Sequence, residues 1–506
     1  TGVPLALKRD ATDGVQSVHV EVKHPDEINT LFDPAIVYAK GSRLMHMLRR
    51  WLGDDAFRKG LKAYFEKHQY GNTIGRDLWN ALGDASGRDV AAFMDSWLEQ
   101  PGYPVLTAVV ENDTLKISQK QFFIGEHEDQ GRQWVVPLNS NWSGIPDTLE
   151  TETLEIPGYA ALAAANSKPL RFNTENTAHY ITDYQGELLD AIVDNMASLD
   201  NLSKQQILQE RRLLAESGVI SYASLLPVIE KLTQETSYLV VSAVSSILQG
   251  LSLFVDEGTE VEAAYKKLLV TFNQFNFERL GFEPKAGEAD EDEMVRQLVI
   301  SNMIKGDDAK ASAKASEIYA AHADDISKLP AAIRLQILIN QIKHHESKEL
   351  TDLYLNTYAQ AKDGNFKRQL STALAYTTDA DTVEKILTEW KNKDVVKPQD
   401  LAMSWYFTFL HHEFTQESAW TWARENWEWV KAALGGDMSF DKFVIYPANT
   451  FKTAERLAEF KAFFEPQLSD MAISRNISMG IKEIAARVDL IQREKVAVEA
   501  AILATN

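Results

Sequence analysis

The spacing of apolar residues changes twice along the chain, and each change predicts a domain boundary. In residues 1–102 the apolar positions recur in steps of three and four, as in amphipathic helices, whereas in residues 103–185 they alternate in short runs, as in strands. From residue 186 to residue 506 the helical spacing returns, in segments of about 12 to 18 residues with short polar breaks. We therefore expect a mainly α protein with a small antiparallel β-sandwich at 103–185 and an α-solenoid, HEAT- or armadillo-like, at 186–506.

One helix of the first part is predicted at residues 36–53. Apolar residues recur along one side of it, at Val37, Gly41, Leu44, Leu48 and Trp51. Asp33 is placed to cap this helix, Pro34 suits its first position because the missing N–H would have no partner there, and Gly53 ends it. Tyr38 lies beside the apolar side, so its phenol can point out of the core into a cleft.

Three more helices are expected before residue 102. The first begins at Asp54, the second at Thr73 and the third near Ser86. Their inward residues are Phe57, Leu61, Tyr64 and Phe65; Leu78, Trp79 and Leu82; and Val90, Phe93, Met94 and Trp97. Alternation then predicts strands at 105–110, 115–123, 133–142, 148–156 and 169–172, and a last strand near 179–184 that leads into the helices.

Composition narrows the class of protein. The 506 residues are 45% hydrophobic and 25% charged, as in ordinary globular proteins, and the length suggests several domains. A net charge of −21 argues against a nucleic-acid partner, because phosphates would be repelled. The absence of cysteine excludes disulfides and thiolate metal sites and fits a cytoplasmic protein. No apolar run approaches the length of a membrane span, so no membrane partner is expected.

Several strings in the first hundred residues resemble a known family. These are Phe32-Asp33, YAKG at 38–41, Leu52-Gly53, Gly60-Leu61, Leu78-Trp79 and WLEQPGYP at 97–104. They are similar to the second half of the catalytic domain of zinc aminopeptidases of the aminopeptidase N family, of the bacterial cytosolic type. Later strings follow in the family's order, among them LGF at 280–282, QD at 399–400 and AWTWARENW at 419–427. The resemblance implies that residues 1–102 are the helical end of a thermolysin-like domain.

The resemblance also implies one catalytic residue. In the family the tyrosine of the YxKG string is catalytic, and the matching residue is Tyr38. A phenol suits this role, because its O–H can stabilise the negative charge that grows on a peptide carbonyl oxygen during attack. The reaction implied is removal of the N-terminal amino acid from peptides. The residues that would bind the substrate are not indicated.

The metal-binding strings of the family are not in this sequence. Neither HExxH nor GxMEN occurs, and the His-Glu pairs at His127, His345 and His412 lack a second histidine four residues after the first. We therefore expect zinc only in a complete enzyme, with no metal ligand in this chain. On this hypothesis the chain is the C-terminal portion of the enzyme, its partner is the missing N-terminal half, and it is inactive alone.

Other residues invite functional interpretations that we consider weaker. Adjacent histidines at 344–345 and 411–412 point about 100° apart on a helix, so neither pair easily shares one ion. Trp420, Trp422, Trp427 and Trp429 form two rows seven residues apart, which favours packing between helices over a ligand box. The acidic run at 287–293 is best explained as a helix start. Arg334 or Arg368 would suit the carboxylate end of a peptide, although surface charge is the simpler explanation.

A second hypothesis of a different class is a non-catalytic protein. A related scaffold or peptide-binding protein would keep the sandwich and the solenoid, whose concave surface suits binding, without ever having held a metal. We prefer the enzyme, because a scaffold has no reason to keep the YxKG string beside a cleft.

Overall fold

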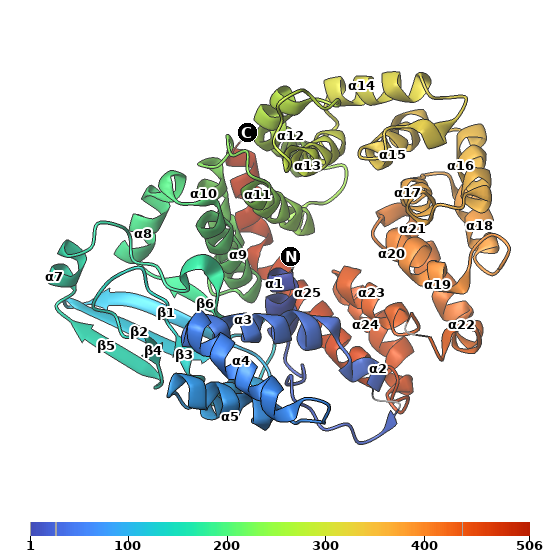
Figure 1. Cartoon of the computed structure of the whole chain (residues 1–506). Helices are drawn as coiled ribbons and strands as arrows, with labels where there is room; N and C mark the ends of the chain where they lie inside the picture. Colours follow the sequence, from blue (N-terminus) through green and yellow to red (C-terminus); the bar gives the residue numbers. More distant parts are fainter. Residues whose placement is uncertain (1, 26–27, 438, 506) are drawn as a thin grey trace. The chain divides into compact units, whose positions relative to one another are not determined.

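The computed structural model describes residues 2–25, 28–437 and 439–505. The chain divides into two compact units, and in the sequence the boundary falls between Lys231 and Leu232. We call residues 1–231 unit 1 and residues 232–506 unit 2. Figure 1 shows that both are largely helical and that the strands lie in unit 1. The mainly α fold with a small β part is as predicted. The finer division at residues 102 and 185 stays a prediction.

The opening of unit 1 is helical. Its elements are α1 (Gly2–Asp10), α2 (Ile28–Leu31), η2 (Ala35–Lys40), α3 (Gly41–Leu52), α4 (Asp54–His68), α5 (Gly75–Ser86) and α6 (Val90–Leu98). The helix expected at 36–53 is present as η2 and α3, and Asp33 caps it, since its Oδ1 accepts the backbone N–H of Ala35 at 2.9 Å. Its first turn, η2, is a π-helix, which the sequence did not predict.

The π-helical turn changes which residues face the core. Because a π turn holds more residues than an α turn, the buried positions of η2 are Ala35, Ile36 and Lys40, and Val37, expected inward, is only partly buried. Beyond the turn the α-helical spacing resumes, and Leu44 and Leu48 are buried as predicted. Tyr38 is left on the outer side.

Helices α4 to α6 pack as a group with one difference from expectation. Val90, Phe93, Met94 and Trp97 of α6 are all buried, as predicted. Phe65 of α4, expected inward, is 64% exposed. Helices α4 and α5 approach closely at Gly60, where a Cβ atom would lie only 2.7 Å from Cδ2 of Leu82. The packed face of α4 does not include Phe65.

The β part consists of two small sheets. The strands are β1 (Pro104–Glu111), β2 (Thr114–Gln121), β3 (Val136–Pro137), β4 (Thr148–Leu149), β5 (Thr153–Pro157) and β6 (Ile181–Tyr184). Four of them form a sheet in the order β5-β2-β1-β6, and β3 pairs with β4 (Figure 1). The β1–β2 pair is antiparallel, with Val105 opposite Lys120, but β6 is parallel to β1, which corrects the expectation of a wholly antiparallel sandwich.

Residues 169–172 do not form the predicted strand. The side-chain amide of Asn141 takes the place of a neighbouring strand. Its Nδ2 donates to the carbonyl of Pro169 at 2.8 Å, and its Oδ1 accepts the backbone N–H of Arg171 at 2.7 Å. The backbone N–H of Asn141 also donates to the carbonyl of Arg171 at 3.1 Å, and the N–H of Phe172 donates to the hydroxyl of Tyr184 at 2.6 Å. These bonds pair the segment without a regular ladder.

Unit 1 ends in short helices around one long helix. They are α7 (Tyr159–Ala164), η3 (Thr174–Asn176), α8 (Glu187–Asp194), η4 (Met196–Ser198), α9 (Asn201–Ser217), η5 (Tyr222–Leu225) and α10 (Leu226–Glu230). The long helix α9 packs against β6 and buries polar residues as well as apolar ones, among them Glu210.

Unit 2 is a succession of helices. They are α11 (Tyr238–Leu251), η6 (Ser252–Phe254), α12 (Glu260–Leu280), α13 (Asp292–Lys305), α14 (Ala309–Ala320), η7 (Ile326–Lys328), α15 (Arg334–His345), α16 (Lys348–Gln360), α17 (Gly364–Leu374), α18 (Ala380–Glu389), α19 (Pro398–Asp400), η8 (Leu401–Tyr406), α20 (Phe407–Leu410), α21 (Glu413–Glu425), α22 (Trp427–Leu434), α23 (Lys442–Thr450), α24 (Ala454–Phe464), η9 (Glu465–Gln467) and α25 (Ser474–Ala504). Side-chain caps start many of them, at Thr259, Asp308, Ser347, Asp363, Asp379 and Thr453.

The last helix of unit 2 returns to the first ones. Helix α25 packs against α23 and α24, its neighbours in sequence, and also against α12 and η6. The Nζ atom of Lys495 on α25 lies 2.5 Å from Oδ2 of Asp256, which follows η6. An ideal solenoid repeat contacts only its neighbours, so this return contact is an addition to the predicted pattern.

Candidate functional site

Tyr38, the predicted catalytic residue, lies on the π-helical turn η2 with its side chain 63% exposed. Phe32 packs edge-on against the phenol ring, with ring centroids 5.6 Å apart. An exposed phenol with its ring supported on one side is free to donate its O–H to a bound group. The turn therefore presents a hydrogen-bond donor to the outside of unit 1.

Lys40 lies two residues further on the same turn and is fully buried. Its Nζ is 2.8 Å from Oδ2 of Asp10 on α1, and it donates to the carbonyl of Gly102 at 3.0 Å. Oδ1 of Asp10 accepts the backbone N–H of Gly102 at 3.0 Å, and its Oδ2 lies 3.0 Å from Nε2 of His179. We call Asp10, Lys40, Gly102 and His179 the buried anchor.

The charges of the buried anchor compensate one another. Burial lowers the pKa of His179 to about 4, so its ring is neutral near pH 7 and its Nε2 proton is assigned to the bond with Asp10. Burial alone would raise the pKa of Asp10, but the Lys40 ammonium and the bond from His179 outweigh it, and the pKa is lowered. One ammonium and one carboxylate are therefore enclosed together.

A second buried cation ties α3 to the loop before β6. The guanidinium of Arg43 donates to the backbone carbonyls of Asn176 and Ala178, and to Oδ1 of Asn176 at 2.6 Å. Burial lowers the pKa of Arg43 to about 10, which still leaves it charged at neutral pH. Tyr38, Lys40 and Arg43 thus lie on one continuous segment that is fixed at two places.

A buried carboxylate lies behind this segment. Glu210 on α9 accepts from Nε2 of Gln206 at 2.8 Å and from the backbone N–H of Thr182 at 3.3 Å. Burial raises its pKa to about 7, in spite of these two donors and the positive charge of Arg43, all of which lower the pKa. Glu210 is therefore poised between its two protonation states near neutral pH.

The three His-Glu pairs do not form metal sites. Within the residues that the structure describes, no three His, Cys, Asp or Glu side chains are grouped so that they could hold a metal ion. His127 stacks on Phe123, His345 has Nε2 3.1 Å from the hydroxyl of Ser316, and the ring of His412 packs on Tyr376. These described residues do not fit zinc.

The acidic run at 287–293 stabilises helix starts. Glu288 pairs with Arg296, and Asp292 lies 2.7 Å from Arg279. Glu291 accepts the first backbone N–H of α11, that of Tyr238, at 2.9 Å. The acidic run therefore has a structural role at the starts of helices, as predicted.

The tryptophans of α21 and α22 belong to the core. The ring of Trp420 contacts those of Phe451, Phe463 and Phe464, and its Nε1 donates to Glu459 at 2.9 Å. Trp422 packs edge-on against Trp429, with centroids 5.9 Å apart, while Trp427 contacts three phenylalanines, Phe440, Phe463 and Phe464. Packing between helices, as predicted, explains all four.

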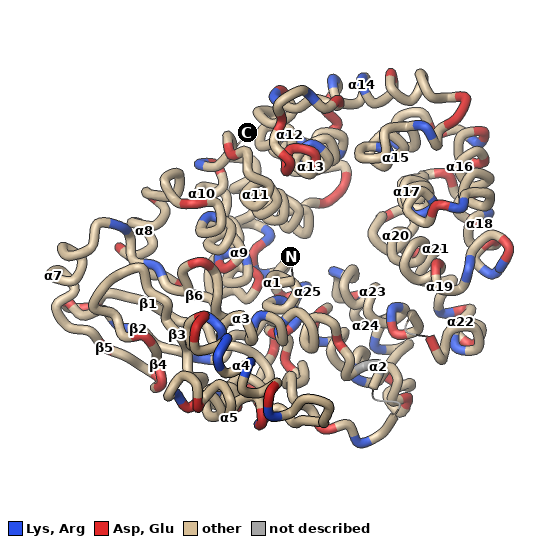
Figure 2. The backbone as a smooth tube through the Cα atoms, viewed as in Figure 1, with Lys and Arg blue, Asp and Glu red and all other residues tan. Residues whose placement is uncertain are grey.

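The two arginines differ in their environment. Arg334 donates to the carbonyls of Ser327 and Leu329 and lies over the ring of Phe366, with its guanidinium carbon 4.8 Å from the ring centroid. It thus has a structural role. Arg368 is exposed on α17. Figure 2 shows that acidic and basic residues are interspersed along both units.

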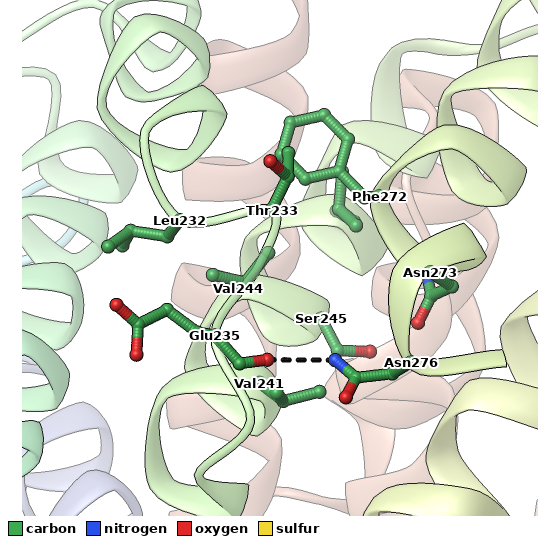
Figure 3. A pocket seen from close by; sticks show the side chains of 10 residues that line it. Leu232, Thr233, Glu235, Val241, Val244, Ser245, Phe272, Asn273 and Asn276 are labelled. Carbon is green, nitrogen blue, oxygen red and sulfur yellow. Dashed lines mark hydrogen bonds between the residues drawn. The ribbon is translucent and has the colours of Figure 1, made fainter. Parts of the chain in front are cut away.

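A small cavity lies between α11 and α12 in unit 2 (Figure 3). Val241, Val244, Phe272 and polar side chains line it, and Asn276 donates to the carbonyl of Glu235 at 2.8 Å. Its volume is about 10 Å³, enough for one water molecule. This cavity is too small for a peptide.

The sequence predicted Tyr38 as a site residue, which stays a prediction, but it did not predict the residues that hold the turn on which Tyr38 lies. Asp10 and His179 are 169 positions apart and carry no shared pattern, so no local signal joins them. Gly102 belongs to the WLEQPGYP string, and nothing in that string indicates its bonds to Asp10 and Lys40. In the structure Asp10 and Gly102 contact Lys40, and His179 contacts Asp10.

Comparisons with known proteins place the chain in a family. Residues 2–97 match the model of the peptidase family M1 domain, and residues 170–486 match that of the ERAP1-like C-terminal domain. Aminopeptidase N of Lactococcus lactis subsp. lactis is 62% identical over 502 residues, which cover 99% of this chain and 59% of that protein. Aminopeptidase N of Lactobacillus helveticus is 43% identical over 498 residues, which cover 98% and 59%.

More distant relatives align over the same length. Aminopeptidase 2 of Candida albicans is 27% identical over 498 residues, covering 95% of this chain and 52% of that protein. The chain spans 59% of the length of the bacterial relatives named above. No helix among the described residues is long and apolar enough to cross a membrane. From its two domain matches, the chain belongs to the aminopeptidase N family of M1 peptidases, those that carry an ERAP1-like C-terminal domain.

Proposed function

We propose that this chain is the C-terminal portion of a zinc aminopeptidase that removes N-terminal amino acids from peptides, and that Tyr38 is its catalytic contribution. The names of the relatives and the share of their length that the chain covers support the proposal. The observation that carries it is the position of Tyr38, an exposed phenol on a turn whose next polar residue, Lys40, is fixed in the core.

The role of the phenol follows from its chemistry. During attack on a peptide bond, negative charge develops on the carbonyl oxygen, and a donor held at that point lowers the barrier. Tyr38 has an O–H on an exposed side chain and a backbone that is anchored on its inner side. An anchored backbone reduces the number of positions that the phenol can take before the charge appears.

The zinc of the proposed enzyme would be held outside these residues. The described His, Asp and Glu side chains do not form a ligand set, so we derive no step through the metal. We propose that the ligands lie in the part of the protein that the longer relatives have in addition, and that this chain alone hydrolyses no peptide. The helical part is proposed to limit access to the cleft, so that short or unfolded peptides enter.

The scaffold hypothesis has less support, because the relatives named above are aminopeptidases. The cytoplasmic location stays a prediction.

The test is Tyr38→Phe in the full-length protein, assayed with an aminoacyl chromogenic substrate. We expect kcat to fall about a hundredfold while KM and the bound zinc stay unchanged, because only the donated hydrogen bond is lost. Tyr70→Phe is the matched control, since Tyr70 is a fully exposed tyrosine of the same unit. An unchanged kcat in Tyr38→Phe would contradict the proposal, as would an equal fall in both variants.

A further inference from the structure

We propose that Lys40 is a positioning residue for Tyr38 and acts through the π-helical turn that the two residues share. The inference rests on the proposed function of Tyr38. It concerns how the phenol is held, and it assigns Lys40 no contact with substrate.

The π-helical turn directs Tyr38 and Lys40 to opposite sides. Tyr38 and Lys40 are two residues apart in η2, so their side chains leave the backbone in roughly opposite directions. Lys40 points inward and is 0% exposed, whereas Tyr38 points outward. Any rotation of the turn that moves one side chain must therefore move the other.

Several segments of unit 1 hold Lys40. Its ammonium contacts Asp10 on α1 at 2.8 Å and the carbonyl of Gly102, in the loop after α6, at 3.0 Å. Asp10 in turn holds both the N–H of Gly102 and the ring of His179 at 3.0 Å. Helix α1 also packs closely on the turn, since a Cβ atom on Gly2 would lie 3.2 Å from Cβ of Ala39. The inner side of the turn is thus fixed from several directions.

The contacts of Lys40 restrain the turn, whereas other contacts restrain the rest of the helix. Arg43 already fixes α3 to Asn176 and Ala178. The helix as a whole therefore has an anchor without Lys40. Lys40 adds a restraint on the π turn itself. Such a turn is a short and uncommon conformation, and contacts with neighbouring segments must stabilise it. A catalytic donor loses about a hundredfold in rate when it is displaced by about 1 Å, so this local restraint is the one that catalysis requires.

The test is a double-mutant cycle in the full-length protein with Tyr38→Phe, Lys40→Met and the two combined. We expect Lys40→Met to lower kcat about 10- to 100-fold with KM within about twofold. In the Tyr38→Phe background the same substitution should lower kcat less than about twofold, because the phenol O–H that it positions is already gone. Arg43→Met is the matched control, a buried cation of the same segment, and its effects should be similar in both backgrounds.

The outcomes distinguish the two proposals. If Tyr38→Phe itself leaves kcat unchanged, the proposed function fails. If Tyr38→Phe lowers kcat but Lys40→Met lowers it by the same factor in both backgrounds, Lys40 is merely structural and this inference is overturned.

A second measurement covers the case in which Lys40→Met does not fold. Asp10→Asn combined with Lys40→Met removes both charges at nearly constant volume, and the 506-residue chain is compared with and without them by hydrogen exchange. We expect the exchange of the amides of residues 35–41 to accelerate more than that of the amides of α9. Equal protection of residues 35–41 in both forms would overturn the inference.

Discussion

The Nζ atom of Lys40 lies 2.8 Å from Oδ2 of Asp10, and neither side chain is exposed to solvent. Two opposite charges enclosed in this way depend on each other, because each without its partner would be a buried, uncompensated charge. The pair joins the first helix of the chain to the turn that carries Tyr38. The stability of the Lys40–Asp10 pair therefore affects how firmly the turn that carries Tyr38 is held.

Removal of one charge should destabilise unit 1 more than removal of both. We expect Lys40→Met alone to cost about 3 to 5 kcal/mol of unfolding free energy, because Asp10 remains buried without its ammonium. Adding Asp10→Asn should recover part of this loss. Protection factors of the β1 amides report on the stability of unit 1 alone and provide the measurement. Losses that simply add in the double variant would contradict the coupling.

His179 should make unit 1 less stable in acid. Its pKa falls from 6.5 to about 4 on folding because burial disfavours the imidazolium. Between pH 4 and pH 6.5 the folded state thus binds fewer protons than the unfolded state. The contribution of His179 to the free energy of unfolding is therefore present above pH 6.5 and is lost as the pH falls to 4. His179→Gln should reduce this loss by about 3 kcal/mol in the same exchange experiment. His127→Gln, on the surface, should leave the slope unchanged.

Glu210 should have the opposite effect. Burial raises its pKa from 4.5 to about 7, so the folded state retains a proton that the unfolded state has lost. The contribution of Glu210 is therefore fully present below pH 4.5 and is lost as the pH rises through 7. Between pH 4.5 and pH 7, the free energy of unfolding of Glu210→Gln should rise by about 3 kcal/mol relative to that of the wild type. A gain that is independent of pH would show that Glu210 does not titrate in this range. Glu128→Gln, exposed on a loop, is the control.

Two glycines of the resemblance strings should respond differently to alanine. Gly102 has a φ of +85°, and a Cβ atom there would lie 2.3 Å from Nε2 of Gln121, so Gly102→Ala should cost about 1 to 3 kcal/mol. Gly41 has a helical φ of −54°, and the nearest atom to an added Cβ is the carbonyl oxygen of Ile36 at 3.8 Å. Gly41→Ala should therefore change stability by less than about 1 kcal/mol. Thermal unfolding of both variants provides the comparison, and equal losses would contradict it.

Local patterns predicted most of the helices but not every strand or the exact helical registers. The cap at Asp33 and the buried face of α6 follow from neighbouring residues, and the structure has both. The π turn was missed because its i to i−5 hydrogen bond, from Gly41 to Ile36, has no sequence signature. Phe65 was placed inward because periodicity gives the direction of a helical face but not its width.

The candidate site was predictable only on its outer side. Tyr38 stood at the edge of an apolar stripe, which is a local observation, and its side chain is exposed. The residues behind it come from distant positions, as with the 62 positions between Lys40 and Gly102, and only tertiary structure brings them together. The same limit explains residues 169–172, whose backbone partners are Asn141, 28 to 30 positions away, and the hydroxyl of Tyr184.

The return of α25 to α12 and η6 has a consequence for how unit 2 comes apart. An open array of helices can fray from either end, one repeat at a time, at small cost per step. Here the final helix is also a neighbour of the initial ones, joined by Lys495 and Asp256, so neither terminus is a free edge. Loss of the last thirty or so residues would strip α12 of a packing partner as well as α23 and α24, and melting would spread inward from both directions at once.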